Sequence, residues 1–229
     1  MKRRLACFLS LLMLGCAILS GCQSGPKEYQ KVLSEEEIAQ LQKEKYTLCN
    51  PGGSFADVGP AIPLEEEIQD APFATLEFVE QLPTIEYIYT PEEGTPEAIL
   101  AEKGGMSQYK FHYLAYKFKV KETITGEIPS YLIGEDNTLT MALPRAFDGS
   151  MPKFQVGDKY VMKIGLTNTS ETLKTGWFNP YGVFYVTDSN CVLSTTNDEK
   201  RQIYSGYRLN DFEGILQEME RNPSEPISE

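Results

Sequence analysis

The residues able to perform chemistry are few, and their spacing argues against the common catalytic constellations. The chain of 229 residues holds a single histidine, His112, which stands between Phe111 and Tyr113. A Ser-His-Asp triad would need this imidazole as its base, and no Gly-x-Ser-x-Gly elbow is present to supply the nucleophile. A zinc site built from several histidines is excluded by the count. We therefore expect His112 to be packed or exposed on an aromatic strand rather than catalytic.

Carboxylates are abundant, so the composition is compatible with a glycosidase-type acid pair. The adjacent acids at 35–37 and 65–67 fall in the first turns of expected helices, where the helix dipole explains them. The acidic segments at 135–137 and 188–190 lack the ligand spacing of a calcium loop and are interpreted as turns. No catalytic residue, metal ligand or cofactor is expected, and a hydrolase that uses paired carboxylates stays an alternative.

An aromatic loop at 176–182, Gly-Trp-Phe-Asn-Pro-Tyr-Gly, is the best candidate for a ligand-binding site. It contains the only tryptophan of the chain, Trp177, together with Phe178 and Tyr181. Exposed aromatic rings bind sugars and peptides by stacking. The alternative is a loop that folds back to close one end of the domain and buries Trp177 and Phe178 in the core.

The N-terminus has the pattern of an export signal. Three basic residues at 2–4 precede an apolar run at 5–19, which is shorter than the roughly 20 residues that cross a bilayer. The following Leu19-Ser20-Gly21-Cys22 resembles the lipobox of bacterial lipoproteins. In that family the cysteine thiol receives diacylglycerol, the chain is cut before the cysteine, and the new amine often receives a fatty acid such as palmitate. The resemblance implies an extracytoplasmic protein anchored through Cys22; Gly15-Cys16 is a weaker second match.

Two further cysteines, Cys49 and Cys191, would remain in the mature chain. Export permits a disulfide between them, and two buried free thiols are the equally weighted alternative. No Cys-x-x-Cys or His-rich spacing accompanies either residue, so neither indicates a metal site.

The charge of the mature chain excludes one class of partner. Cleavage removes three of the 21 basic side chains, which leaves 18 against 33 acidic ones and a net charge of about −15. Such a chain repels phosphate backbones, so no nucleic-acid partner is expected. It also repels an anionic membrane surface, so the N-terminal lipid is the expected membrane attachment. An envelope protein or a glycan is the remaining partner.

Hydrophobic periodicity predicts a strand-rich body between short helices. Helices are expected at 34–45, 63–70, 95–104 and 210–222, and strands at 74–82, 85–89, 109–125, 139–143, 160–166, 183–186 and 192–194. The longest strand changes phase, because Tyr109, Phe111 and Tyr113 alternate on the face opposite Leu114 and its successors. We expect a bulge near Tyr113–Leu114 to restore a single inner face.

Three diffuse segments, 73–83, 118–127 and 154–161, resemble a group of bacterial lipoproteins with the OB-fold of tissue inhibitors of metalloproteinases and netrin-like domains. The order of strands and turns matches that group over about residues 60–220, which implies a fold rather than an activity. Those inhibitors chelate the protease zinc through a free N-terminal cysteine. Because the N-terminal Cys22 is expected to be lipidated, that mechanism is not implied.

The sequence therefore predicts a mainly β fold with helices, namely a five-stranded OB-type Greek-key barrel with short N-terminal helices and a packed C-terminal helix. The expected divisions are a signal peptide at 1–21, a flexible tether at 22–33, one barrel domain at 34–222 and a disordered tail at 223–229. The expected function is a lipid-anchored binding or interaction module of the cell envelope with an unidentified ligand. A structural accessory lipoprotein without a small ligand is, besides the hydrolase, the other alternative.

Overall fold

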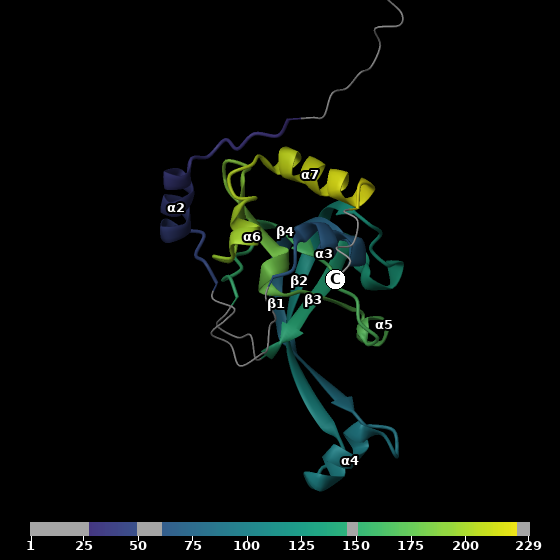
Figure 1. Cartoon of the computed structure of the whole chain (residues 1–229). Coiled ribbons are helices and arrows are strands. Elements are labelled where there is room, and N and C mark those ends of the chain that lie inside the picture. Colours follow the sequence, from purple (N-terminus) through teal and green to yellow (C-terminus); the bar gives the residue numbers. More distant parts are fainter. Residues whose placement is uncertain (1–27, 50–60, 146–150, 224–229) are drawn as a thin grey trace, which may run out of the picture.

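The computed structural model describes residues 28–49, 61–145 and 151–223 and shows a mainly β fold with helices, as predicted (Figure 1). The strands are β1 (Phe73–Tyr89), β2 (Tyr109–Thr125), β3 (Thr138–Pro144), β4 (Lys159–Lys163), β5 (Thr175–Trp177), β6 (Val183–Val186) and β7 (Val192–Ser194). The helices are α2 (Glu35–Glu44), α3 (Leu64–Asp70), α4 (Pro96–Lys103), α5 (Ser170–Leu173), α6 (Glu199–Gln202) and α7 (Leu209–Arg221). The strands form one sheet in the order β5-β3-β2-β1-β4-β6-β7.

The predicted five-stranded closed barrel is wrong, because the sheet has seven strands and stays open. One edge of β4 pairs with β1 and its other edge pairs with β6, so β4 has no free edge on which β5 could close a barrel. The sheet nevertheless curls. Gly165, just after β4, exchanges two backbone hydrogen bonds of 2.7 and 2.8 Å with Trp177 in β5. This contact is a single residue pair, too short to act as a ladder.

Alternate side chains of the sheet pack into two hydrophobic cores, one on each face of the sheet. The inner core contains Leu76, Phe118 and Tyr160, while the outer core contains Phe73, Val161 and Phe184 together with Phe212 of α7. Successive side chains of a strand point to opposite faces, so β1, β4 and β6 each contribute to both cores. The centre of β4 and the whole of β6 are continuous apolar runs because both of their faces are buried.

Local sequence signals place most helix ends correctly. Ser34 caps α2 in a complete capping box with Glu37, and Thr95 caps α4 with a proline at its first turn. The sequence predicts Asn210 as the N-cap of the C-terminal helix. The N-cap is instead Arg208, two residues earlier, so Asn210 lies inside α7.

The segment at 28–33 contacts the body, although the sequence predicts a flexible tether there. The Tyr29 hydroxyl donates a hydrogen bond of 2.8 Å to Glu218 Oε1 on α7 and lies against Gly214, where a Cβ would be 2.6 Å away. The amides of Val32 and Leu33 both donate to the Gly206 carbonyl. The contacts of the domain therefore begin by Tyr29. The predicted signal peptide, Cys22 and all but the first residue of the predicted tail at 223–229 lie outside the described residues.

Candidate binding surface on a projecting arm

The strands β1 and β2 continue beyond the sheet as a two-stranded arm, residues 83–113, with α4 at its far end (Figure 1). Within it, Ile85 pairs with Tyr113 and Tyr89 pairs with Tyr109. In the described chain β3 pairs only as far as Tyr113 and β4 only as far as Glu77, so no third strand covers either edge of the arm. The arm therefore stands on backbone pairing between two strands alone.

A register shift separates the arm from the sheet. Leu82 pairs with Ala115, but Ile85 pairs with Tyr113, so β1 has one extra residue at this point. The sequence predicted a bulge at this level, but on β2. The extra residue lies in β1 beside Pro83, which has no N–H to give to a ladder, and prolines within sheets are found at such bulges and at edges.

One face of the arm carries five aromatic side chains, and Trp177 of β5 continues them at the base of the arm. We call the six together the aromatic row: Tyr87, Tyr89, Tyr109, Phe111, Tyr113 and Trp177. Neighbouring rings along the arm have centroids 6.3–6.4 Å apart and planes within 18–27° of parallel. At the base, Trp177 meets Tyr113 edge-to-face at 4.6 Å. The arrangement arises because alternate strand residues share a face and paired residues of the two strands lie side by side.

The aromatic row is accessible. Its tyrosines and Trp177 are half-buried, and Phe111 is 42% exposed. Partial burial raises the pKa of the Tyr113 hydroxyl, with a smaller contribution from Tyr87. A contiguous exposed apolar surface of this kind marks an interaction site more often than a scattered exposed residue does.

Trp177 forms the inner end of the row and connects it to the sheet. The preceding Gly176 faces the inner core, where a Cβ would lie 2.9 Å from Ile164 and Met141, so Trp177 points to the outer face. Its indole Nε1 is buried and has no hydrogen-bond partner among the described residues.

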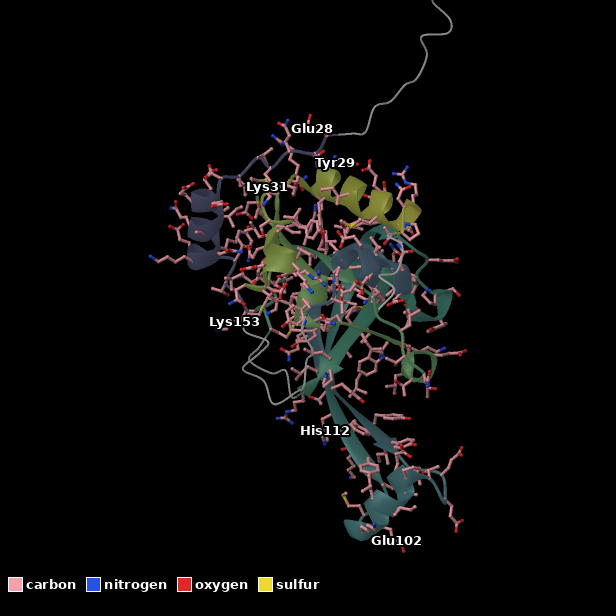
Figure 2. The ribbon with its side chains drawn as sticks, viewed as in Figure 1. Glu28, Tyr29, Lys31, Glu102, His112 and Lys153 are labelled. Carbon is pink, nitrogen blue, oxygen red and sulfur yellow. The ribbon has the colours of Figure 1, made fainter. Side chains whose placement is uncertain are left out.

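The opposite face of the arm carries charged side chains together with the exposed Ile88. Glu86 Oε2 lies 3.9 Å from His112 Nε2, and Glu86 Oε1 lies 4.0 Å from Lys110 Nζ, all on exposed side chains. Exposed pairs at such distances contribute little to stability. Figure 2 places His112 on the arm, where it is exposed on an aromatic strand, one of the two environments expected for it.

The structure separates the three residues of the predicted aromatic loop. Trp177 belongs to the aromatic row, whereas Phe178 is buried in the inner core against Tyr116 and Phe154 at centroid distances of 6.0 Å. Tyr181 is half-buried in a short 3-10 turn, Pro180–Gly182, where its carbonyl accepts a hydrogen bond from Arg201 Nε at 2.8 Å. The loop is therefore not a single platform.

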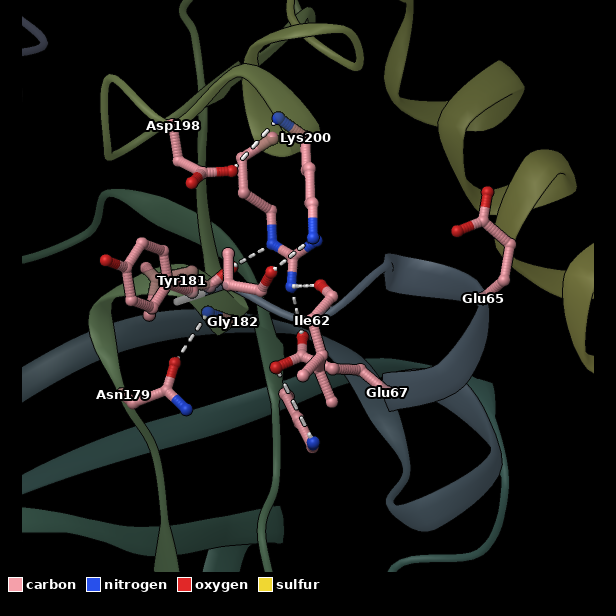
Figure 3. A network of polar contacts seen from close by, with 12 residues as sticks. Ile62, Glu65, Glu67, Asn179, Tyr181, Gly182, Asp198 and Lys200 are labelled. Atoms are coloured by element: carbon pink, nitrogen blue, oxygen red, sulfur yellow. Dashed lines mark hydrogen bonds and ion pairs between the residues drawn. The ribbon is translucent and has the colours of Figure 1, made fainter. Parts of the chain in front are cut away.

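The contact made by Tyr181 is part of a buried polar network around Arg201 (Figure 3). Arg201 on α6 is fully buried; its Nη2 donates to the Ile62 carbonyl at 2.9 Å and lies 2.8 Å from Glu67 Oε2. Lys163 Nζ lies 3.8 Å from Glu67 Oε1. The network joins α6, α3 and the turn at Tyr181, and its carboxylate is neutralised rather than free to act on a substrate.

The described part of the chain shows no two buried acids that face each other as a catalytic pair. Glu67 is the only acidic side chain there in the buried class. Glu213 on α7 is half-buried; desolvation and the nearby Glu122 raise its pKa, and it accepts a hydrogen bond of 3.0 Å from Thr75. The described residues also contain no group of three or more His, Cys, Asp or Glu side chains that could hold a metal ion.

Cys49 and Cys191 are both free and buried. Cys49 forms a backbone β-bridge with Thr196, and Cys191 forms one with Arg208. Cys191 and Thr196 are the two ends of the extended run that contains β7, so Cys49 lies beside the end opposite Cys191. Five residues of extended chain span about 16 Å, well beyond the Cα separation of a disulfide. Burial raises the pKa of the Cys49 thiol to about 12, which keeps it unreactive.

Comparison with known proteins adds no relative: no family model, curated protein or solved structure matches the chain. The described helices include none with the length and apolar character needed to cross a membrane. The functional interpretation therefore rests on the sequence and on the geometry of the arm.

Proposed function

We propose that the protein is a lipid-anchored binding module of the bacterial cell envelope and that the aromatic row is its contact surface. The observation that carries the proposal is the row itself. Five rings line one face of a ribbon that projects from the body, and Trp177 of β5 adjoins them at its base. The helix α4 contacts the outer end of the row at Tyr109, whereas Phe111 in the middle of the row is 42% exposed. Aromatic side chains are enriched where proteins contact partners because each buries a large area at a low cost in conformational entropy.

The expected lipid anchor supports this interpretation. The basic residues at 2–4, the short apolar run and the cysteine at position 22 predict acylation. One acyl chain binds a membrane only marginally, whereas two or three hold it stably, so dual acylation at Cys22 would fix the domain at the surface. A module fixed in this way needs a contact surface that extends from the body, and the arm provides one.

A binding role accounts for more of the structure than the hydrolase alternative does. The single buried acid, Glu67, is held by Arg201 at 2.8 Å and is approached by Lys163. Glu213 lies between α7 and the sheet and already accepts a hydrogen bond from Thr75. In contrast, the aromatic row is unexplained by packing, since stability alone would favour burying these rings.

Site-specific photo-cross-linking in native cell envelopes tests the proposal. Benzoylphenylalanine is placed at Phe111 in the row or at Leu166 on the body, two apolar side chains with matched exposures of 42% and 43%. We expect an adduct of defined mass from position 111 and none from position 166. Equal yields at the two positions, or no adduct at position 111, would contradict a specific contact through the row.

A further inference from the structure

The far end of the arm exposes aliphatic side chains that the aromatic row does not explain. Ile99, Leu100 and Met106, which we call the tip patch, are 46%, 63% and 49% exposed. The helix α4 that carries two of them is held in place on the arm: Ala101 is buried, and the Tyr109 hydroxyl donates a hydrogen bond of 3.0 Å to the Glu97 carbonyl. The patch is therefore presented on a fixed support.

From these contacts we infer that the tip patch docks a folded protein whose surface is apolar and positively charged, on the side of the molecule that faces away from the anchoring membrane. This inference rests on the proposed function and adds the chemical class and the position of the partner. Four occupants are conceivable for an uncovered apolar patch: a partner protein, a glycan, a second copy of this chain and a lipid surface.

The side-chain types favour a protein over a glycan. Sugars are recognised by stacking on the faces of rings, which would use Tyr89 or Tyr109 but leaves Ile99, Leu100 and Met106 without a role. Aliphatic side chains and methionine are buried efficiently by the apolar side chains of another protein, and methionine is enriched in such interfaces. The tip patch and the aromatic row follow each other along one arm, so a protein could cover both.

The charge around the patch specifies the rim of the partner. The segment at 90–106 contains one lysine and four glutamates, which are Glu92, Glu93, Glu97 and Glu102. None of these glutamates forms an ion pair within the described part of the chain. A basic rim would complement these charges and speed association. A second copy would bring the same acids together, which disfavours self-association.

The position of the chain end argues against the anchoring membrane as occupant. Figure 2 shows Glu28 and Tyr29 at one end of the molecule and Glu102 at the other. Six residue steps separate Cys22 from Glu28, and they span at most roughly 22 Å when fully extended. A short link of this length holds the α7 end near the lipid, so the tip points away from the bilayer. The acidic tip is also repelled by anionic headgroups.

The test uses the full-length, lipidated protein in native envelopes, with benzoylphenylalanine in place of Leu100. We expect an adduct that protease digestion converts to peptides of a second, basic protein. The yield should fall about tenfold in the variant that carries Glu92→Gln, Glu93→Gln, Glu97→Gln and Glu102→Gln, because electrostatic steering is lost. The matched control changes four exposed glutamates on the body to glutamine: Glu36, Glu127, Glu135 and Glu171. Its yield should be unchanged.

The outcomes separate this inference from the proposed function. An adduct at Phe111 without one at Leu100 would overturn the tip as a docking site but keep the row as a contact surface. A glycan, lipid or homodimer adduct at Leu100 would overturn the partner class. Equal loss of yield in the tip and body charge variants would show that net charge, rather than the tip, attracts the partner. Circular dichroism of each variant establishes that its fold is retained.

Discussion

Replacing Arg201 with methionine should be among the most destabilising single substitutions that this domain tolerates. The guanidinium is fully buried, and it forms hydrogen bonds of 2.8 Å to the Tyr181 carbonyl and 2.9 Å to the Ile62 carbonyl. It also lies 2.8 Å from Glu67, whose side chain is 5% exposed. Methionine fills much of the same volume but leaves the carboxylate without its closest cation, since Lys163 is 3.8 Å away.

The expected loss is about 3–5 kcal/mol of unfolding free energy, the usual cost of removing one partner of a buried ion pair. The two orphaned carbonyls should bring the loss toward the upper end of that range. For a domain of this size, with a urea dependence of about 2 kcal/mol per molar, the midpoint should fall by about 2 M. Urea titration followed by circular dichroism measures this shift.

Two controls make the result interpretable. Arg221→Met removes an arginine from an exposed position on α7 and should change stability by less than about 0.5 kcal/mol. The double variant Arg201→Met with Glu67→Met should lose at least about 1 kcal/mol less than the sum of the two single variants, because it removes the stranded charge. A loss below about 1 kcal/mol for Arg201→Met, or additive single effects, would refute the structural role of the pair.

Four further predictions follow from the site and the anchor. Phe111→Ala should change the unfolding free energy measured in urea by less than about 1 kcal/mol, because the ring is partly exposed. The same variant should reduce cross-linking from position 100, and unchanged cross-linking would count against the aromatic row as a contact surface. Cys22→Ser should abolish incorporation of labelled fatty acid and lower the intact mass by the lipid, and retained label would place the anchor elsewhere. Both remaining thiols, Cys49 and Cys191, should react with Ellman's reagent only after unfolding, whereas fast reaction in the folded protein would contradict their burial. Glu213→Gln should stabilise the protein at neutral pH. The folded-state pKa of Glu213 is raised, so the native chain loses stability as the pH rises through that pKa. Urea titrations at several pH values should show that the advantage of the variant vanishes below the ordinary glutamate pKa of about 4.3. An advantage that grows at low pH would reverse the sign of the argument.

Most strands and the longer helices are predictable because their signals are local, whereas β5, α5 and α6 were not predicted, and β5 overlaps the predicted loop at 176–182. Ser34 with Glu37 and Thr95 with Pro96 predict helix starts that the structure has, and the alternation in β1, β2, β3 and β4 places each strand. Whether the sheet closes into a barrel is not determined by local sequence signals. It depends on which strand occupies the second edge of β4, and β6 takes that edge instead of β5. No residue pattern in β4 distinguishes the two neighbours, since its residues are buried on both faces in either case.

The sequence contains the alternation that produces the aromatic row, but the prediction assigned these rings to the wrong face of the strand. Tyr109, Phe111 and Tyr113 alternate out of phase with Leu114, and a bulge on β2 was expected to return them to the inner face. In the structure β2 has no bulge near Tyr113–Leu114, and the out-of-phase rings lie on the outer face of the arm. An apolar pattern that switches face within one strand can therefore indicate a second buried or binding surface. The partnership with Trp177 required the tertiary fold.

The arm is built from the same two backbones that cross the centre of the sheet. The pairing of β1 with β2 extends from Phe73 and Thr125, between the two cores, to Tyr89 and Tyr109 near α4. A partner that pulls or twists the tip would therefore transmit force to the central β1–β2 ladder, and the register shift beside Pro83 is the first irregularity that this force meets. Hydrogen exchange should show this continuity as a gradient, in which amides become steadily more protected from the tip toward the body.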